Sequence, residues 1–255
     1  MGLGSKEQLT STRLTDNLPE HLGAATVKHL TWNSCFGFLA VVLIAQFAGA
    51  SVVTVDDFDD GTIDLEATHV MHTDSISNQA TTSAIGGFRS VGVALMSDYL
   101  SVRANSNPMP GVIAFSSGSQ SMGFFDLTYA GEGGTGLGGI DITNGGTNRV
   151  MSVDFAAADM GAGLELGIED SNGNFGIFST LVGGPGVASF ALSDFTDAGV
   201  DLTSIEMIDI AIIGEEDGDY TIDSIYAAVP EPGTIAIWSI LGVGTVFYTR
   251  RRQKI

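Results

Sequence analysis

Two histidines are the first residues of this chain whose type and spacing suggest chemistry. His69 and His72 lie three residues apart, and on a helix this spacing would place both imidazoles on one face, as in a metal site. The surrounding sequence has no helical periodicity, and no third ligand follows at metal-site spacing. We therefore predict an ordinary loop that carries two histidines.

A glycine-rich segment, residues 131–139, is the second candidate. Six of its nine residues are glycine, which is typical of loops that approach a phosphate closely. A phosphate-binding loop also needs Gly-Lys-Ser/Thr, and a dinucleotide-binding turn needs a helix after it; neither follows here. The segment therefore favours a flexible hairpin tip or loop.

Catalytic signals are otherwise sparse. The chain contains 30 acidic residues, so some carboxylates would lie at glycosidase spacing by chance. The Gly-x-Ser-x-Gly element of serine hydrolases is not present. We name no catalytic residue and predict that the protein is not an enzyme.

The elements that must position any site are strands. Short runs rich in Val, Ile, Phe and Thr alternate with Gly, Asn and Asp, without a long stretch of 3.6-residue periodicity. This spacing predicts an all-β fold, a β-sandwich. The candidate strands are residues 51–55, 90–95, 100–104, 112–115, 122–129, 140–143, 149–155, 164–168, 175–180, 187–192, 205–213 and 220–226.

Turn residues agree with these strand limits. Asn172-Gly173 is a strong signal for a hairpin between two strands. Pro108, Pro110 and Pro185 all fall between candidate strands, where the missing N–H does no harm.

The C-terminal 27 residues combine three elements in order. Pro230-Glu231-Pro232 is followed by an apolar run and then by the basic cluster Arg250, Arg251 and Arg252. A helix over residues 234–249 would be about 24 Å long, shorter than the ~30 Å hydrocarbon core of a bilayer. The basic cluster predicts that the end of the chain stays in the cytoplasm.

This order resembles the PEP-CTERM sorting signal of Gram-negative bacteria, over residues 229–255. The resemblance implies a temporary transmembrane anchor that a membrane-embedded transpeptidase, exosortase, cuts near the Pro-Glu-Pro element. It also implies a mature protein that is released or re-attached at the cell surface. An ordinary C-terminal membrane anchor is the alternative.

The N-terminal end predicts export as well. Residues 36–47 are apolar, and the following Ala48-Gly49-Ala50 has the small-x-small form that signal peptidase requires. We place cleavage after Ala50, so that residues 1–50 form the leader. Cys35 precedes the apolar run and is therefore not a lipid attachment site.

A single domain of residues 51–228 remains between these ends, and it is strongly acidic. The whole chain has a formal net charge of −20, but Arg89, Arg103 and Arg149 are the only strongly basic residues of the domain, which has no lysine. Such a charge repels nucleic acid and anionic lipid surfaces. Strong acidity is also typical of proteins that bind calcium or function in salty water.

Four segments of the domain resemble jelly-roll, galactose-binding-like modules of exported bacterial proteins: residues 55–61, 86–91, 190–195 and 220–225. Many such modules bind carbohydrate, and several hold a structural calcium ion between the first and last strands. Carried onto this chain, the resemblance implies Asp57, Asp59 and Asp223 as calcium ligands, because carboxylate oxygens suit a hard cation. Solvated acids in turns are the alternative, and Phe58 disrupts an EF-hand pattern.

Three functions follow from these observations. We favour an exported, non-enzymatic protein of the cell surface or extracellular matrix, close to exopolysaccharide. The second is a calcium-supported carbohydrate-binding module, although both tryptophans, Trp32 and Trp238, lie in the terminal segments. The third is a secreted polysaccharide hydrolase or lyase.

Overall fold

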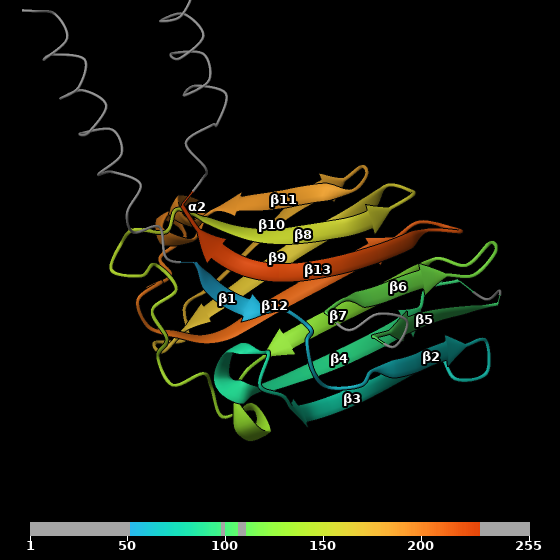
Figure 1. The fold of residues 1–255 in the computed structure, drawn as a ribbon, viewed down its shortest axis with the longest axis horizontal. Helices are drawn as coiled ribbons and strands as arrows, with labels where there is room; N and C mark the ends of the chain where they lie inside the picture. Colours follow the sequence, from blue (N-terminus) through green and yellow to red (C-terminus); the bar gives the residue numbers. More distant parts are fainter. Residues whose placement is uncertain (1–51, 98–99, 107–110, 230–255) are drawn as a thin grey trace, which may run out of the picture. The chain divides into compact units, whose positions relative to one another are not determined.

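The computed structural model describes residues 52–97, 100–106 and 111–229 (Figure 1). Thirteen strands in these residues form two antiparallel sheets, with one short α-helix, α2 (Leu192–Asp197), and the 3-10 turns η1 (Ile85–Gly87) and η2 (Glu132–Gly134). The all-β sandwich predicted from the sequence is therefore confirmed. Both terminal segments lie outside the described residues.

The first sheet has seven strands in the order β11-β8-β13-β6-β5-β2, and β1 also pairs with β13. In chain order these strands are β1 (Val53–Asp56), β2 (Asp64–Thr68), β5 (Ser101–Asn105), β6 (Ile113–Ser117), β8 (Val150–Ala158), β11 (Gly186–Ala191) and β13 (Asp219–Ala228).

The second sheet has six strands in the order β10-β9-β12-β7-β4-β3. In chain order these strands are β3 (Thr73–Ala80), β4 (Phe88–Leu95), β7 (Gly123–Tyr129), β9 (Ala162–Asp170), β10 (Phe175–Val182) and β12 (Ile205–Gly214). Figure 1 shows β10 and β11 together at one side of the sandwich and β2 and β3 at the opposite side.

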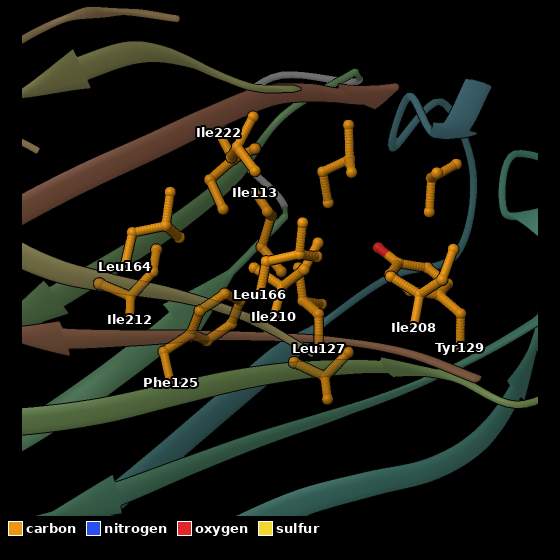
Figure 2. Close-up of a cluster of buried hydrophobic side chains, with 14 of the residues drawn as sticks. Ile113, Phe125, Leu127, Tyr129, Leu164, Leu166, Ile208, Ile210, Ile212 and Ile222 are labelled. Carbon is orange, nitrogen blue, oxygen red and sulfur yellow. The ribbon is translucent and has the colours of Figure 1, made fainter. Parts of the chain in front are cut away.

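The core lies between the sheets and follows from two-residue alternation along the strands. Phe125 and Leu127 of β7 point inward with Leu166 of β9 and Ile210 of β12, and all four are fully buried (Figure 2). Fully burying one such side chain contributes about 1.5–3 kcal/mol. The intervening residues of the same strands face the outer side of the sheet.

Most predicted strands match observed ones, but three assignments were wrong. Residues 140–143 make a single isolated bridge, Ile140 to Ile205, and no strand. The strands β2 and β3 were missed because both carry many polar residues. In β2 only Leu65 and Ala67 are buried, and β3 is an edge strand with little burial.

The predicted connections hold where the structure describes them. Asn172-Gly173 lies in the hairpin between β9 and β10, and Gly173 has a φ of 78°. His69 and His72 lie in the loop between β2 and β3, without helix. The glycine-rich segment is a loop with the short turn η2, and Pro185 separates β10 from β11.

Candidate functional site

The outward face of the six-stranded sheet carries four carboxylates, which we call the acidic face. They are Asp126 on β7, Glu165 and Glu169 on β9, and Asp209 on β12. Register places Glu165 and Asp126 on either side of Ala211, so their backbones are about 10 Å apart at usual strand spacing. Thr128 lies directly opposite Asp209 and donates a hydrogen bond to its Oδ1 over 2.8 Å.

Small residues form the floor between these carboxylates. The carboxyl group of Asp126 lies over Gly92, where an added Cβ would come within 3.1 Å of its Cγ. The ring of Phe175 lies over Gly167 in the same way, because a Cβ there would be 2.8 Å from the ring Cζ. Side chains from the neighbouring strands can therefore approach the backbone closely in this part of the sheet.

Phe175 gives the acidic face an aromatic surface. It is the first residue of β10, lies opposite Glu169 in the register, and is 47% exposed although its ring contacts the sheet. Ile177 pairs with Gly167 on the next row. An aromatic ring beside carboxylates combines an apolar contact with hydrogen-bond acceptors.

The electrostatics of the face differ from those of an ordinary surface. Partial burial raises the pKa of the Asp126 carboxyl group, and the neighbouring charge of Asp209 raises it further. Among the described residues, neither carboxylate forms an ion pair, and both can accept hydrogen bonds from a ligand. The face is therefore suited to ligands rich in hydroxyl groups.

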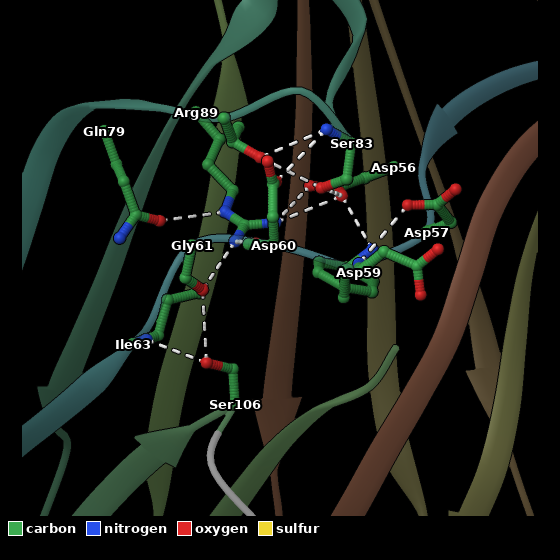
Figure 3. Close-up of polar contacts among 12 residues, drawn as sticks. Asp56, Asp57, Asp59, Asp60, Gly61, Ile63, Gln79, Ser83, Arg89 and Ser106 are labelled. Carbon is green, nitrogen blue, oxygen red and sulfur yellow. Dashed lines mark hydrogen bonds and ion pairs between the residues drawn. The ribbon is translucent and has the colours of Figure 1, made fainter. Parts of the chain in front are cut away.

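A second carboxylate cluster lies at the end of β1 and is buried. Arg89 of β4 forms an ion pair with Asp56 at 2.8 Å, with both side chains fully buried (Figure 3). Asp56 also accepts hydrogen bonds from the Tyr129 and Ser83 hydroxyl groups at 3.0 and 2.9 Å. We call this group, Asp56, Asp60, Ser83, Arg89 and Tyr129, the arginine clasp.

The guanidinium of Arg89 is satisfied on every side. Its Nε donates to Gln79 at 3.1 Å, and a second nitrogen donates to the carbonyl of Gly61 at 3.0 Å. Its Cζ lies 5.4 Å from the ring centroid of Phe58. β1 belongs to the seven-stranded sheet and β4 to the six-stranded sheet. The clasp therefore connects the two sheets through the loop that follows β1.

Asp60 fastens the same loop to the segment before η1. Its carboxylate accepts hydrogen bonds from Thr81, from the backbone N–H and hydroxyl of Thr82, and from the N–H of Ser83. The bonds from Thr82 and Ser83 lower the pKa of Asp60 to about 2. Burial raises the pKa of Tyr129 well above its usual value, and the charge of Asp56 adds to the shift.

Two of the predicted calcium ligands, Asp57 and Asp59, adjoin the clasp without taking part in it. Asp57 and Asp59 share one turn, where the N–H of Asp59 donates to Asp57 Oδ1 at 3.3 Å, while Asp223 is exposed on β13. Among the residues that the structure describes, no group of three or more His, Cys, Asp or Glu side chains is placed to hold a metal ion. Calcium binding stays a prediction.

Sequence reasoning did not find the residues that the structure brings together here. Two of the segments that suggested a jelly roll, 55–61 and 86–91, meet in the arginine clasp through Asp56 and Arg89. The signal in the sequence was the isolated arginine itself, one of three in an acidic domain. On the acidic face, the signal in the sequence is the two-residue spacing of Glu165, Gly167 and Glu169, which places the three residues on one face of a strand.

The sorting signal, Pro230, Glu231, Pro232 and Arg250–Arg252, and the cleavage residues Ala48 and Ala50 lie outside the described residues. Within the described part of the chain, no helix is both long and apolar enough to cross a membrane. The leader and the anchor stay predictions.

Comparisons with known proteins give distant likenesses only. No protein-family model matches the chain, and no curated protein matches it. The family 11 carbohydrate-binding module from Clostridium thermocellum, solved with a β-1,3-1,4-mixed-linked tetrasaccharide, is 12% identical with a TM-score of 0.35; the match covers 71% of this chain and 98% of that one. TmCBM61, solved with β-1,4-galactotriose, is 15% identical with a TM-score of 0.32, covering 54% and 86%.

An exo-β-agarase is also similar, at 11% identity and a TM-score of 0.37, over 71% of this chain and 25% of that enzyme. PfGH50B is 13% identical with a TM-score of 0.35, and the match covers 51% of this chain and 22% of that one. Likeness at this level assigns neither a family nor a function.

Proposed function

We propose that this chain is an exported surface or matrix protein whose β-sandwich binds polysaccharide without cleaving it. One observation carries the proposal: the half-exposed ring of Phe175 lies over Gly167, with Glu169 directly opposite Phe175 and Asp209 directly opposite Gly167 on the neighbouring strands. Sugar rings offer C–H groups that stack on an aromatic face and hydroxyl groups that donate to carboxylates.

The charge of the protein narrows the class of polysaccharide. Glu165, Glu169 and Asp209 have no basic side chain among their described hydrogen-bond or ion-pair partners, so the acidic face repels anionic polymers. We infer a neutral polysaccharide as the ligand. Salt should weaken this interaction little, because it depends on hydrogen bonds and stacking instead of ion pairs.

The ends of the chain supply the proposed route to the surface. The leader that ends at Ala50 brings the chain to signal peptidase, and the PEP-CTERM-like tail brings it to an exosortase in a Gram-negative bacterium. Replacing Pro230 and Pro232 by alanine in a host with exosortase should leave the precursor in the membrane fraction. Equal processing of both forms would contradict this route.

Binding is tested with the full chain on a panel of neutral and acidic glycans, followed by calorimetry with the best neutral ligand. We expect Phe175→Ala to weaken binding about tenfold, which corresponds to ~1.4 kcal/mol. Leu181→Ala is the matched control, because Leu181 lies on the same face of the same strand and is 84% exposed. Binding that survives in Phe175→Ala would overturn the proposal.

The same titration tests calcium. If Asp57, Asp59 and Asp223 hold a structural ion, EDTA should lower the affinity of the wild-type chain, and Asp59→Asn should reduce that sensitivity. A titration in which EDTA and Asp59→Asn change nothing would leave polysaccharide binding intact and remove calcium from it.

A hydrolase is the second candidate, and one observation favours it. The pKa of Asp126 is raised, by partial burial and by the neighbouring Asp209, and glycosidases use two carboxyl groups of which one has a raised pKa. Incubation of the full chain with polysaccharide and measurement of reducing ends tests this function. We expect no turnover; cleavage that Asp126→Asn abolishes would make the protein an enzyme.

A further inference from the structure

The free edge of β10 is the most unusual surface that the acidic face does not use. Within the described part of the chain, β10 is the last strand of the six-stranded sheet and pairs with β9 alone, through eight residue pairs without a register shift. Half of its backbone N–H and C=O groups therefore point away from the sheet. Such a strand is a template for another strand.

Edge strands of soluble proteins usually carry charge, and this one does not. No residue from 171 to 193 is charged, although the chain as a whole has a net charge of −20. Ile177 and Leu181 on β10 are 52% and 84% exposed, and Val187 on the adjoining β11 is 51% exposed. The described edge is thus long, regular, apolar and uncharged.

The opposite edge of the same sheet shows how the protein protects a strand elsewhere. The register of β3 is irregular between Ile76 and Gln79, and Asp74 places a carboxylate on the strand. Asn78 accepts a hydrogen bond from the N–H of Gly133 at 2.6 Å, which brings the glycine-rich loop to this strand. A bulge, a charge and a covering loop are the devices that prevent edge pairing.

We propose that β10 pairs antiparallel with β10 of a second copy of this chain, about a two-fold axis perpendicular to the sheet. Antiparallel pairing of two identical strands is self-complementary. Ile177, Ser179 and Leu181 of one copy would therefore lie against the same three residues of the other copy, in reverse order. A charged partner strand would find no opposite charge on β10.

Repulsion between the two acidic domains does not prevent this pairing. The nearest carboxylates on this face, Glu165 and Glu169, lie one strand inward on β9. Across a β10–β10 junction they are three strand spacings from their equivalents, about 14 Å, whereas the Debye length at physiological salt is about 8 Å. Raising the salt above the physiological level should therefore change the association little, whereas very low salt should weaken it.

The test uses one sheet row that ends in serine at both edges. The register joins Ser179 of β10 to Ser75 of β3 through Glu165, Ala211, Asp126 and Gly92. Ser179 and Ser75 are both exposed, so Ser179→Lys and Ser75→Lys make the same charge change on surface positions of the two edges. Sedimentation equilibrium of the full chain in one non-ionic detergent measures self-association, and circular dichroism checks that both variants remain folded.

We expect a reversible dimer whose dissociation constant rises about tenfold or more in Ser179→Lys and stays within about twofold in Ser75→Lys. A wild-type chain that is monomeric at every concentration overturns the proposal. This is the result that we would expect if another segment of the same chain covered β10. Equal loss of association in both variants also overturns the proposal, because the loss would then come from the added charge and not from its position on β10. Glycan binding by Phe175 remains testable in either case.

Discussion

The arginine clasp and the acidic face are both carboxylate clusters, but the fold uses them in opposite ways. In the clasp, Asp56 is fully buried and a guanidinium and two hydroxyl groups satisfy it. On the acidic face, Asp126 and Asp209 form no ion pair with any basic side chain that the structure describes, and the pKa of Asp126 is raised. The comparison teaches that a carboxylate stabilises this fold where donors surround it and is free to meet a ligand where they do not.

Removing the clasp cation should have the largest effect. Arg89→Met would leave Asp56 buried without its counter-charge, and we expect a loss of about 3–5 kcal/mol in the free energy of unfolding. Arg103→Met is the control, since its pair with Asp64 is about half exposed to solvent and should contribute far less to stability than the buried pair. Urea titration measures both. If the two variants lose the same stability, the clasp does not hold the sheets together.

Changing the floor of the acidic face should affect binding more than stability. In Gly167→Val the new side chain would occupy the space of the Phe175 ring, and we expect glycan affinity to fall about tenfold. Gly163→Val is the matched control on the same strand, because a Cβ there meets Ile213 at an ordinary 3.6 Å. Calorimetry that finds equal affinities for the two variants would separate the Phe175 ring from the site.

Acid should remove the contribution of Asp60. Its pKa is about 2 in the fold, below the ~3.9 of an unfolded chain, so its stabilisation is complete above about pH 4 and disappears towards pH 2. Asp60→Asn should cost about 1 kcal/mol at neutral pH, after allowance for solvent screening. Thermal unfolding of both forms between pH 7 and pH 2 should converge at the acid end. Curves that stay parallel would contradict this role.

The contribution of Asp126 to stability should change with pH in the opposite direction to that of Asp60, and its effect should be the smallest. Its pKa is raised in the fold, so the charged form costs stability as pH rises through that value, and protonation restores it at lower pH. Asp126→Asn should therefore be as stable as wild type at pH 7 or more stable by less than about 1 kcal/mol. The difference should shrink on acidification. A clearly less stable Asp126→Asn would place Asp126 with the clasp carboxylates.

The sequence predicted the fold well where strands follow simple alternation. Val150 to Phe155 and Leu164 to Ile168 were found because apolar residues recur at every second position on a half-buried strand. β3 was missed because Thr73–Ala80 is an edge strand whose residues, apart from Ile76, carry little apolar surface. Strand propensity largely reflects the packing and burial of side chains, and an edge strand buries few of them.

The site was harder to predict than the fold, for a physical reason. Asp56 and Arg89 are 33 residues apart, and Phe175 reaches its place over Gly167 through the register of a hairpin. Sequence patterns give the periodicity of one strand but not which strands lie together. Asp57 and Asp59 drew attention because they resemble known ligands, whereas the structure uses their neighbours Asp56 and Asp60 in the clasp.

The burial of Arg89 also affects how this domain would survive digestion. Lysine occurs only in the terminal segments of the chain, at positions 6, 28 and 254, so a trypsin-like protease depends on arginine between them. Arg89 is inside the core, and Arg103 lies within paired strand β5. Arg149 is exposed before β8, but its N–H donates to the carbonyl of Ala228 and its own carbonyl accepts from the N–H of Leu192, so none of the three arginines offers an unpaired backbone to a protease. A protein that is exposed to secreted trypsin-like proteases would be degraded more slowly because the folded domain offers them so few cleavable bonds.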